Sequence, residues 1–181
     1  MNKDTITPPA NLPIPADDPY RKLTIARADQ DRELPHVGVV GDTYTMLLTG
    51  KETNGRYCLI DMFVPPGGGP PPHRHDFEES FTLLEGEILA TFRGSQVAVR
   101  AGETIHIPAN APHFFVNHGS IPARMLCICS PAGLEEMFLE VGVPVATRTT
   151  PPARLDLPAE EAKLAKMAAL MPKYRAEMIS P

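Results

Sequence analysis

The sequence lacks an excess of basic residues and a long apolar run. Its 17 Lys and Arg against 22 Asp and Glu give a formal net charge of -5, which provides no basic surface for nucleic acid or for an anionic membrane. No apolar run approaches the length of about 20 residues that spans a bilayer. The residues after Met1 lead into prolines instead of the apolar core of a signal peptide. We therefore expect a cytoplasmic protein that binds neither nucleic acid nor membrane.

Cysteine is also scarce, because the three cysteines are too few for a disulfide framework. Cys127 and Cys129 lie two apart in an apolar run, so both side chains should project from one face of a strand. Thiols in such a run are most often buried and inert, and a soft-metal or redox pair is the less common alternative. This cysteine usage favours a reducing compartment.

Proline, in contrast, is abundant, with 21 residues that gather in three clusters over 8–19, 65–72 and 144–158. The length of 181 residues suits one domain with extensions. The sequence predicts three parts: an N-terminal arm with the first edge elements over residues 1–39, a barrel over 40–130 and a helical extension over 131–181.

Short β-branched and aromatic runs alternate with turn residues across the middle of the chain. Eight of these runs are expected to be strands: 43–49, 56–64, 80–84, 88–93, 97–100, 104–107, 113–116 and 124–129. Asn54-Gly55, between the first two runs, favours a tight hairpin turn. Short strands at regular spacing, without helical periodicity between them, predict an all-β antiparallel sandwich or small barrel.

Two helices are expected after the strands. The first has apolar residues at helical spacing from Leu134 to Val141 and should stop at Gly142. The second should begin after Asp156 as its N-cap and end before Pro172. Its apolar stripe has to pack on another surface, and its own barrel and a partner subunit are both open as that surface.

A group of metal-ligand side chains follows the glycine and proline run at residues 67–72. Residues at even separation on a strand project from the same face, so His73 and His75 are neighbours there and Glu79 can share their face. Two imidazoles and a carboxylate are a recurrent ligand set for a divalent metal. The glycines allow the backbone an unusual path and the prolines stiffen it. His113, which also follows a proline-rich turn, is the candidate fourth ligand.

These residues carry a resemblance to the cupin family. Its first motif matches at every spacing, at Gly67, His73, His75, Glu79 and Gly86. Its second motif matches at Gly102, Pro108, His113 and Asn117, with Asn110 in place of a glycine. Asparagine is the non-glycine residue that best tolerates a positive φ, so the turn can survive this change. The resemblance covers about residues 40–130, and in style the chain is similar to small quercetin-dioxygenase-like cupins.

The resemblance implies a double-stranded β-helix, a jelly-roll barrel, with one divalent transition metal (Fe, Mn, Ni, Co, Cu or Zn) held by His73, His75, Glu79 and His113. It also implies a dioxygenase for a small enolic or aromatic substrate, such as a flavonol or a catechol. Glu79 is in addition a candidate general base, since a carboxylate beside a metal can serve either way. The habit of the family, together with short edge strands, predicts a homodimer.

Other interpretations stay open. With zinc or manganese the same site suits an isomerase-type reaction, and a cupin can also bind a small molecule without catalysis. A two-domain oxalate-type enzyme needs a second pair of motifs, and a transcription regulator needs a basic helix-turn-helix, neither of which is present in this sequence. His106 can face the pocket or the outside of the sheet. Backbone carbonyls or Asn117 are expected to hold the imidazole rings.

Overall fold

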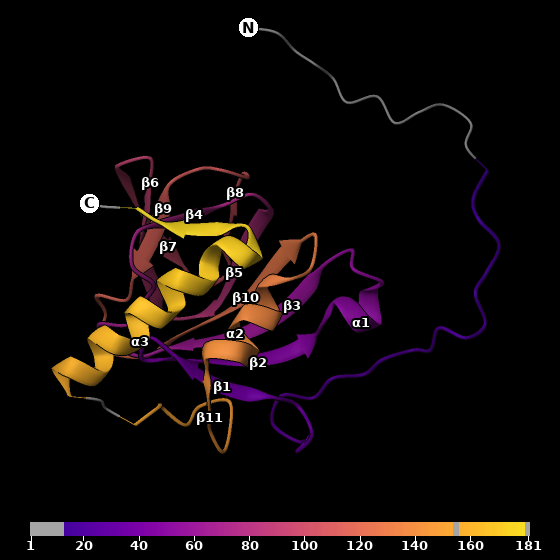
Figure 1. Ribbon diagram of the computed structural model, residues 1–181, viewed down its shortest axis with the longest axis horizontal. Coiled ribbons are helices and arrows are strands. Elements are labelled where there is room, and N and C mark those ends of the chain that lie inside the picture. The colour runs from indigo at the N-terminus through magenta and orange to yellow at the C-terminus, as the bar shows by residue number, and fades with distance from the viewer. Residues whose placement is uncertain (1–12, 154–155, 180–181) are drawn as a thin grey trace, which may run out of the picture.

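Two antiparallel sheets close into a jelly-roll barrel in the computed structural model, which describes residues 13–153 and 156–179 (Figure 1). The larger sheet has the order β11 (Val143–Pro144), β1 (His36–Val39), β2 (Asp42–Leu48), β3 (Cys58–Val64), β10 (Ala123–Ser130), β5 (Glu78–Glu85) and β8 (Thr104–Ile107). The smaller sheet has the order β12 (Ala176–Met178), β4 (His73–His75), β9 (His113–Val116), β6 (Glu87–Phe92) and β7 (Ser95–Arg100). The expected all-β fold class with C-terminal helices is confirmed.

All eight expected strands are present, with ends that shift by two residues at most. The alternation of inward and outward residues along the strands determines which side chains form the core. Ile60, Leu83, Ile88 and Met125 come from four strands of the two sheets and are all fully buried. Burying one such side chain is worth about 1.5–3 kcal/mol, so these residues hold the strands that carry the ligands.

The prediction of a tight hairpin turn at Asn54-Gly55 was wrong. Strands β2 and β3 do pair antiparallel, but a short helix, α1 (Gly50–Thr53), lies between them. Thr49 and Glu52 form a capping box at its start, and Asn54 ends it in the left-handed conformation with φ 56°. The Thr-x-x-Glu pattern that signals such a helix was present in the sequence, and it outweighs the turn preference of Asn-Gly.

The C-terminal segment covers one side of the barrel (Figure 1). Helix α2 (Leu134–Val141) begins and ends as predicted, and Asp156 caps α3 (Leu157–Leu170) by accepting a hydrogen bond from the Ala159 N–H. Helix α3 and the 3-10 helix η1 (Met171–Tyr174) bury Met167 and Met171 against the chain's own barrel. The sequence did not reveal that β11 and β12, from the same segment, each extend a sheet of the barrel.

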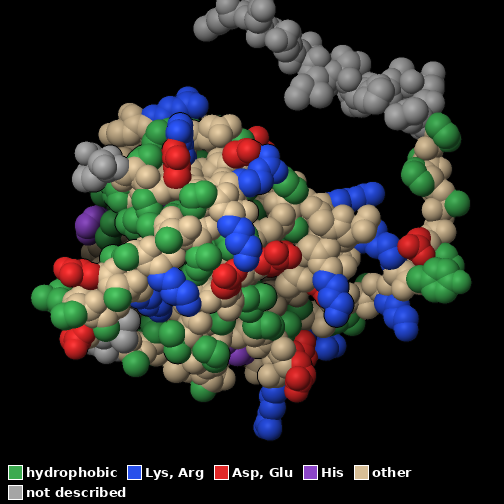
Figure 2. Space-filling view, in the orientation of Figure 1, with side chains coloured by type: hydrophobic (Ala, Val, Ile, Leu, Met, Phe, Trp, Pro, Cys, Tyr) green, Lys and Arg blue, Asp and Glu red, His purple; other side chains and the backbone are tan. Residues whose placement is uncertain are grey.

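Residues 13–25 extend away from the barrel as an arm that carries apolar side chains (Figure 2). Ile14, Tyr20 and Leu23 are 95%, 90% and 88% exposed. Arg21 ties the arm to the barrel through a hydrogen bond of 3.0 Å to the Glu52 carbonyl. Within the described part of the chain, no helix combines the length and the apolar character needed to cross a bilayer.

Candidate metal centre

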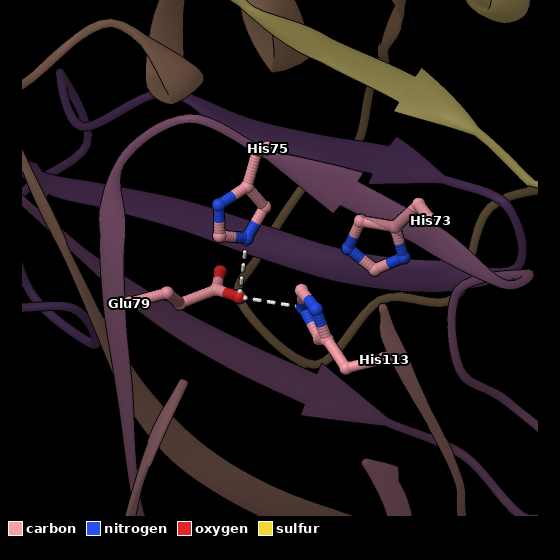
Figure 3. Close-up of side chains that lie close together, drawn as sticks. All are labelled: His73, His75, Glu79 and His113. Atoms are coloured by element: carbon pink, nitrogen blue, oxygen red, sulfur yellow. Dashed lines mark hydrogen bonds and ion pairs between the residues drawn. The ribbon is translucent and has the colours of Figure 1, made fainter. Parts of the chain in front are cut away.

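The four predicted ligands come together between the two sheets (Figure 3). His73 and His75 lie on β4, and His113 lies on the neighbouring strand β9, directly opposite His73. Glu79 reaches the same point from β5, which belongs to the other sheet. The centre therefore joins the two halves of the barrel.

The glycine run fixes the path by which the chain enters β4. Gly69 has φ 134°, and a side chain there would place its Cβ 2.1 Å from the Phe115 carbonyl oxygen, so only glycine fits. The Gly67 N–H donates to the Asn117 carbonyl at 2.7 Å, and the Asn117 N–H donates to the Gly68 carbonyl at 3.0 Å. The run is thus bonded to the end of β9, and both histidine strands share one support.

Each imidazole is oriented by a backbone carbonyl two residues away. The Nδ1 atoms of His73, His75 and His113 lie 2.8, 2.9 and 2.9 Å from the carbonyl oxygens of Pro71, Phe77 and Ala111. Because a carbonyl oxygen only accepts, each Nδ1 carries a hydrogen, and each neutral ring then presents the lone pair of Nε2 to the centre. The expectation that backbone carbonyls hold the rings is confirmed.

The alternative that Asn117 holds the rings was wrong. Its side-chain amide donates to the carbonyls of Val64 and Ile121, and its side-chain oxygen accepts from the Gly119 N–H. Asn117 is fully buried and fixes the loop after β9. Its amide therefore bonds three backbone groups and holds this loop, and it makes no hydrogen bond to the imidazole rings.

The ligand atoms converge closely enough to bind a metal. One donor atom from each of the four residues lies within 4.8 Å of the others, and the Nε2 atoms of His75 and His113 are each 3.1 Å from Oε2 of Glu79. Two imidazole lone pairs and an ionised carboxylate repel one another unless a cation lies between them or a ring takes up a second proton. Three imidazoles and a carboxylate are a donor set that suits a borderline divalent metal. The residues therefore fit such an ion.

Burial controls the protonation of the group. His75, Glu79 and His113 are each at most 4% exposed. Burial alone raises the pKa of Glu79, but hydrogen bonds donated by His113 and His75, which require a second proton on those rings when no cation is bound, outweigh it and hold that pKa below its ordinary value. Burial, with the nearby His113 as a second cause, lowers the pKa of His73 to about 4. His73 is therefore neutral near pH 7, which is the form that binds a metal.

The centre opens into a small apolar cavity of about 60 Å³. Met137 and Phe138 of α2, Met167 of α3 and Met171 of η1 close one side of it. Among the described residues that line the cavity, only three of the ligands and Tyr44 have polar side chains. Val39, Val40 and Met167 separate the cavity from a larger outer groove of about 690 Å³, because these three residues line both.

His106 lies outside the centre, on the outer face of the larger sheet. Its Nδ1 is 3.0 Å from Oγ of Ser80, and its Nε2 is 3.0 Å from a carboxylate oxygen of Glu78. His106 and Glu78 are exposed, and Ser80 is half-buried. Glu78 was expected on the outer face because it is adjacent to Glu79 on the strand and adjacent residues point to opposite faces. Of the two positions left open for His106, the pocket and the outside of the sheet, the structure shows the outside.

Sequence reasoning missed the roles of three residues around the ligands. Cys127 and Cys129 were expected to be buried thiols on one strand face, which is confirmed, but their sulfurs also lie against Glu79. The partner is set by the register between β10 and β5, which pairs Cys129 with Glu79. Tyr44, on β2, lines the cavity and was not among the candidates either. No local motif marks either contact.

Comparison with known proteins identifies the family to which the sequence is similar. A family model described as "Cupin domain" matches residues 60–129. An uncharacterized protein of Methanocaldococcus jannaschii is 31% identical over 111 residues, which cover 60% of this chain and 89% of that protein. Quercetin 2,3-dioxygenase of Bacillus subtilis is 27% identical over 95 residues, 52% of this chain but only 28% of the enzyme.

The solved structures support the fold. The structure of a predicted oxalate decarboxylase of Thermotoga maritima matches with a TM-score of 0.53 and 20% identity, and the match covers 60% of this chain and 99% of that one. At this identity the likeness concerns the arrangement of the strands alone.

Proposed function

The chain belongs to the cupin family, and we propose that it is a metal-dependent dioxygenase acting on a small enolic or aromatic substrate. One observation carries the proposal: three histidines and a glutamate converge beside a small apolar cavity, with His75, Glu79 and His113 buried and His73 partly buried. An apolar lining of this kind favours small uncharged molecules over water at a reactive centre.

The proposed metal site consists of His73, His75, Glu79 and His113, with one divalent transition metal per chain. When bound, a redox-active metal supplies oxygen activation and two positions for an enolate or catecholate, whereas zinc supplies a Lewis acid. The fixed Nδ1 hydrogens of the three rings support this assignment, because they leave every Nε2 free for a metal.

Glu79 is proposed as the proton acceptor for the substrate hydroxyl as well as a ligand. It lines the cavity, and its Oε2 lies on the side of the histidines. Apart from the histidines, whose Nε2 lone pairs face the proposed metal, Tyr44 is the only other described lining residue with an ionisable group, and its hydroxyl already donates to Asp42 at 3.1 Å. The remaining acceptor for a substrate proton is Glu79.

The cavity also bears on substrate size. Pockets for drug-sized ligands usually enclose about 300–1,000 Å³, and this cavity of about 60 Å³ is far smaller. A small enolic substrate suits this space better than a flavonol. A flavonol or a substituted catechol requires the wall formed by Val40 and Met167 to move towards the outer groove, which those residues also line.

An isomerase-type reaction with zinc or manganese is the alternative function. It requires a group that removes a proton and a group, the same one or another, that returns it, and apart from the ligand histidines the described lining offers Glu79 and the already bonded Tyr44. A binding role without catalysis makes no such demand. Metal identity and oxygen uptake separate the three functions.

The test starts with elemental analysis of protein purified without chelator or metal-affinity resin. We expect about one equivalent of a redox-active metal, and oxygen uptake in an electrode with a panel of 1,3-diketones, α-hydroxyketones and catechols. Zinc with turnover but no oxygen uptake would favour the isomerase. A verified iron, manganese, nickel, cobalt or copper form that consumes no oxygen with any of these substrates would exclude the dioxygenase.

We also propose that the protein is a homodimer in a reducing cytoplasm. The apolar side chains of Ile14, Tyr20 and Leu23 are almost fully exposed on the arm, and a second copy provides a surface that covers them. All three cysteines are free thiols within the core, which suits a reducing compartment.

A further inference from the structure

Two thiols lie behind the carboxylate of Glu79, on the side away from the histidines. Oε1 of Glu79 is 3.3 Å from Sγ of Cys127 and 3.5 Å from Sγ of Cys129, and the two sulfurs are 3.6 Å apart. Cys129 on β10 is the direct cross-strand partner of Glu79 on β5. All three residues are buried, with exposed fractions of 4% or less.

The two oxygens of Glu79 thus have different surroundings. Oε2 faces the Nε2 atoms of His75 and His113, whereas Oε1 has only sulfur partners among the described residues. An ionised carboxylate accepts hydrogen bonds and cannot donate them, and each thiol carries one hydrogen. Both thiols can therefore donate to Oε1. Each S–H bond is weak, but all three side chains are buried, and none of the other described residues donates a hydrogen bond to this oxygen.

We propose that Cys127 and Cys129 are positioning residues for the metal centre, which hold Oε1 of Glu79 so that the carboxylate presents Oε2 alone to the ion. This inference rests on the proposed metal site. A carboxylate without such partners can bind a metal through both oxygens or turn away from it, and groups behind a ligand commonly set its orientation. The thiols would then keep Glu79 as a ligand through one oxygen and keep the opposite side of the ion open for substrate.

The same three residues are also close enough together to bind an ion of their own. That arrangement would need two buried thiolates and would share Glu79 between two metals. Hydrogen bonding to one carboxylate oxygen accounts for the same sulfur to oxygen distances without a second buried ion. A second soft-metal site is therefore an outcome that the experiment has to separate from positioning.

The experiment compares the full chain with three variants in metal affinity and in the absorption spectrum of bound Co²⁺. C127V/C129V removes both donors and keeps the side chains similar in size, and C127S/C129S keeps a hydroxyl donor at each position. C58V is the matched control, because Cys58 is an equally buried thiol on β3 opposite Cys129 and has no hydrogen bond to Glu79. Competition with a chelator gives the dissociation constant for Co²⁺.

We expect C127V/C129V to bind Co²⁺ about 10–100-fold more weakly, the usual cost of losing a partner behind a ligand. Its Co²⁺ spectrum should also change intensity, since a carboxylate that binds through both oxygens raises the coordination number. C127S/C129S should restore most of the affinity, and C58V should match the wild type. If the double valine variant does not fold, C127V alone carries the comparison.

Three results would overturn the inference. Unchanged affinity and spectrum in C127V/C129V would make the thiols packing residues only. Equal losses in the serine and valine variants would show that hydrogen-bond donation is not their role. A second equivalent of Cd²⁺ bound by the wild type and lost in both variants would assign a thiolate metal site instead. If the wild type and C58V bind no Co²⁺ at all, the proposed function itself fails, and the positioning role fails with it.

Discussion

The backbone N–H of Asn110 donates to the carbonyl of His75 at 2.7 Å, and so connects the turn before one predicted ligand to the strand that carries another. Asn110 has φ 68°, which confirms the left-handed conformation expected at this position. The two sequence motifs therefore support each other through the main chain. The position of His113 relative to His75 depends on this turn as well as on the pairing of β4 and β9.

This relationship predicts the effect of substitutions at Asn110. N110G should fold and bind metal like the wild type, because glycine adopts a positive φ without strain. N110V should lose roughly 1–2 kcal/mol of unfolding free energy, since a β-branched residue is strained there, and it should bind Co²⁺ more weakly. Chemical denaturation and chelator competition give the two quantities. Equal stability of N110V and N110G would mean that the turn does not depend on its φ.

The ligand prediction is tested by removing one imidazole from the centre. H113A should lose metal affinity by more than about 100-fold, because changes behind a ligand alone cost about 10–100-fold. The apoprotein should keep its circular dichroism, and any loss of stability in the metal-loaded protein should be the linkage contribution of the bound metal. H106A is the control, since His106 is an exposed histidine on the outer face of the sheet.

Metal retention in H113A equal to that in H106A would remove His113 from the ligand set. H75A should behave like H113A, because both rings face Oε2 of Glu79 at the same distance of 3.1 Å. Elemental analysis after identical dialysis gives the comparison.

The dual role proposed for Glu79 separates in the glutamine variant. An amide oxygen can still coordinate weakly but cannot accept a proton as a carboxylate does. If Glu79 is the base, E79Q with its metal restored should lose oxygen consumption by about 10²–10⁴-fold, the usual contribution of general base catalysis. Full oxygen consumption in metal-loaded E79Q would limit Glu79 to a ligand role.

The local part of the site could be predicted from the sequence, because the ligands follow from spacing within a motif. His73 and His75 lie two apart on one strand, as predicted. Glu79 does not continue their strand face, because the chain crosses to β5 of the other sheet, where alternation places Glu79 inwards and Glu78 outwards. The thiols beside Glu79 could not be predicted in the same way. Their contact depends on the pairing of Cys129 with Glu79, two residues that lie 50 apart in sequence, and register is not a local property.

The cover of the cavity was predictable only in part. The apolar spacing from Leu134 to Val141 and the cap at Asp156 located both helices. The sequence did not show on which surface the second helix packs, because an amphipathic stripe indicates that it packs on some surface but does not identify which one. The pairing of β12 with β4 involves only Ala176, Glu177 and Met178, a run too short to show a strand pattern of its own. The extended conformation of β12 therefore depends on its pairing with β4, which is distant in sequence.

The exposed arm predicts the oligomeric state. In light scattering at micromolar concentration the wild type should have twice the chain mass of 19.7 kDa. Ile14→Ser, Tyr20→Ser and Leu23→Ser combined should shift it towards the monomer, because they remove the apolar surface that a second copy would cover. Replacing Asp17 and Asp18 on the same arm by Asn is the control. A wild-type monomer would refute the proposed homodimer, and a dimer that survives the triple substitution would place the interface elsewhere.

Asp42 predicts a dependence of stability on pH. It is fully buried, one carboxylate oxygen accepts from the Tyr44 hydroxyl, and the other has no hydrogen-bond partner. Burial raises the pKa of Asp42 to about 7, against the partial opposing effect of the Tyr44 hydroxyl and of the nearby Gly69 backbone. The unfolded chain releases this proton near pH 4. Between about pH 4 and 7 the folded state therefore binds more protons than the unfolded state, so the free energy of unfolding falls as pH rises through this window.

D42N should lose this contribution, because asparagine does not titrate. The melting temperature of the wild type minus that of D42N should become more negative from pH 4 to pH 8, and each unit of pKa difference is worth about 1.4 kcal/mol at the upper end. Comparing the two proteins cancels the titration of the histidines and of Glu79, which both contain. D17N, with its substitution on the exposed arm, should follow the wild type at every pH. Parallel melting curves for the wild type and D42N across this range would mean that Asp42 ionises within the fold as easily as in the unfolded chain.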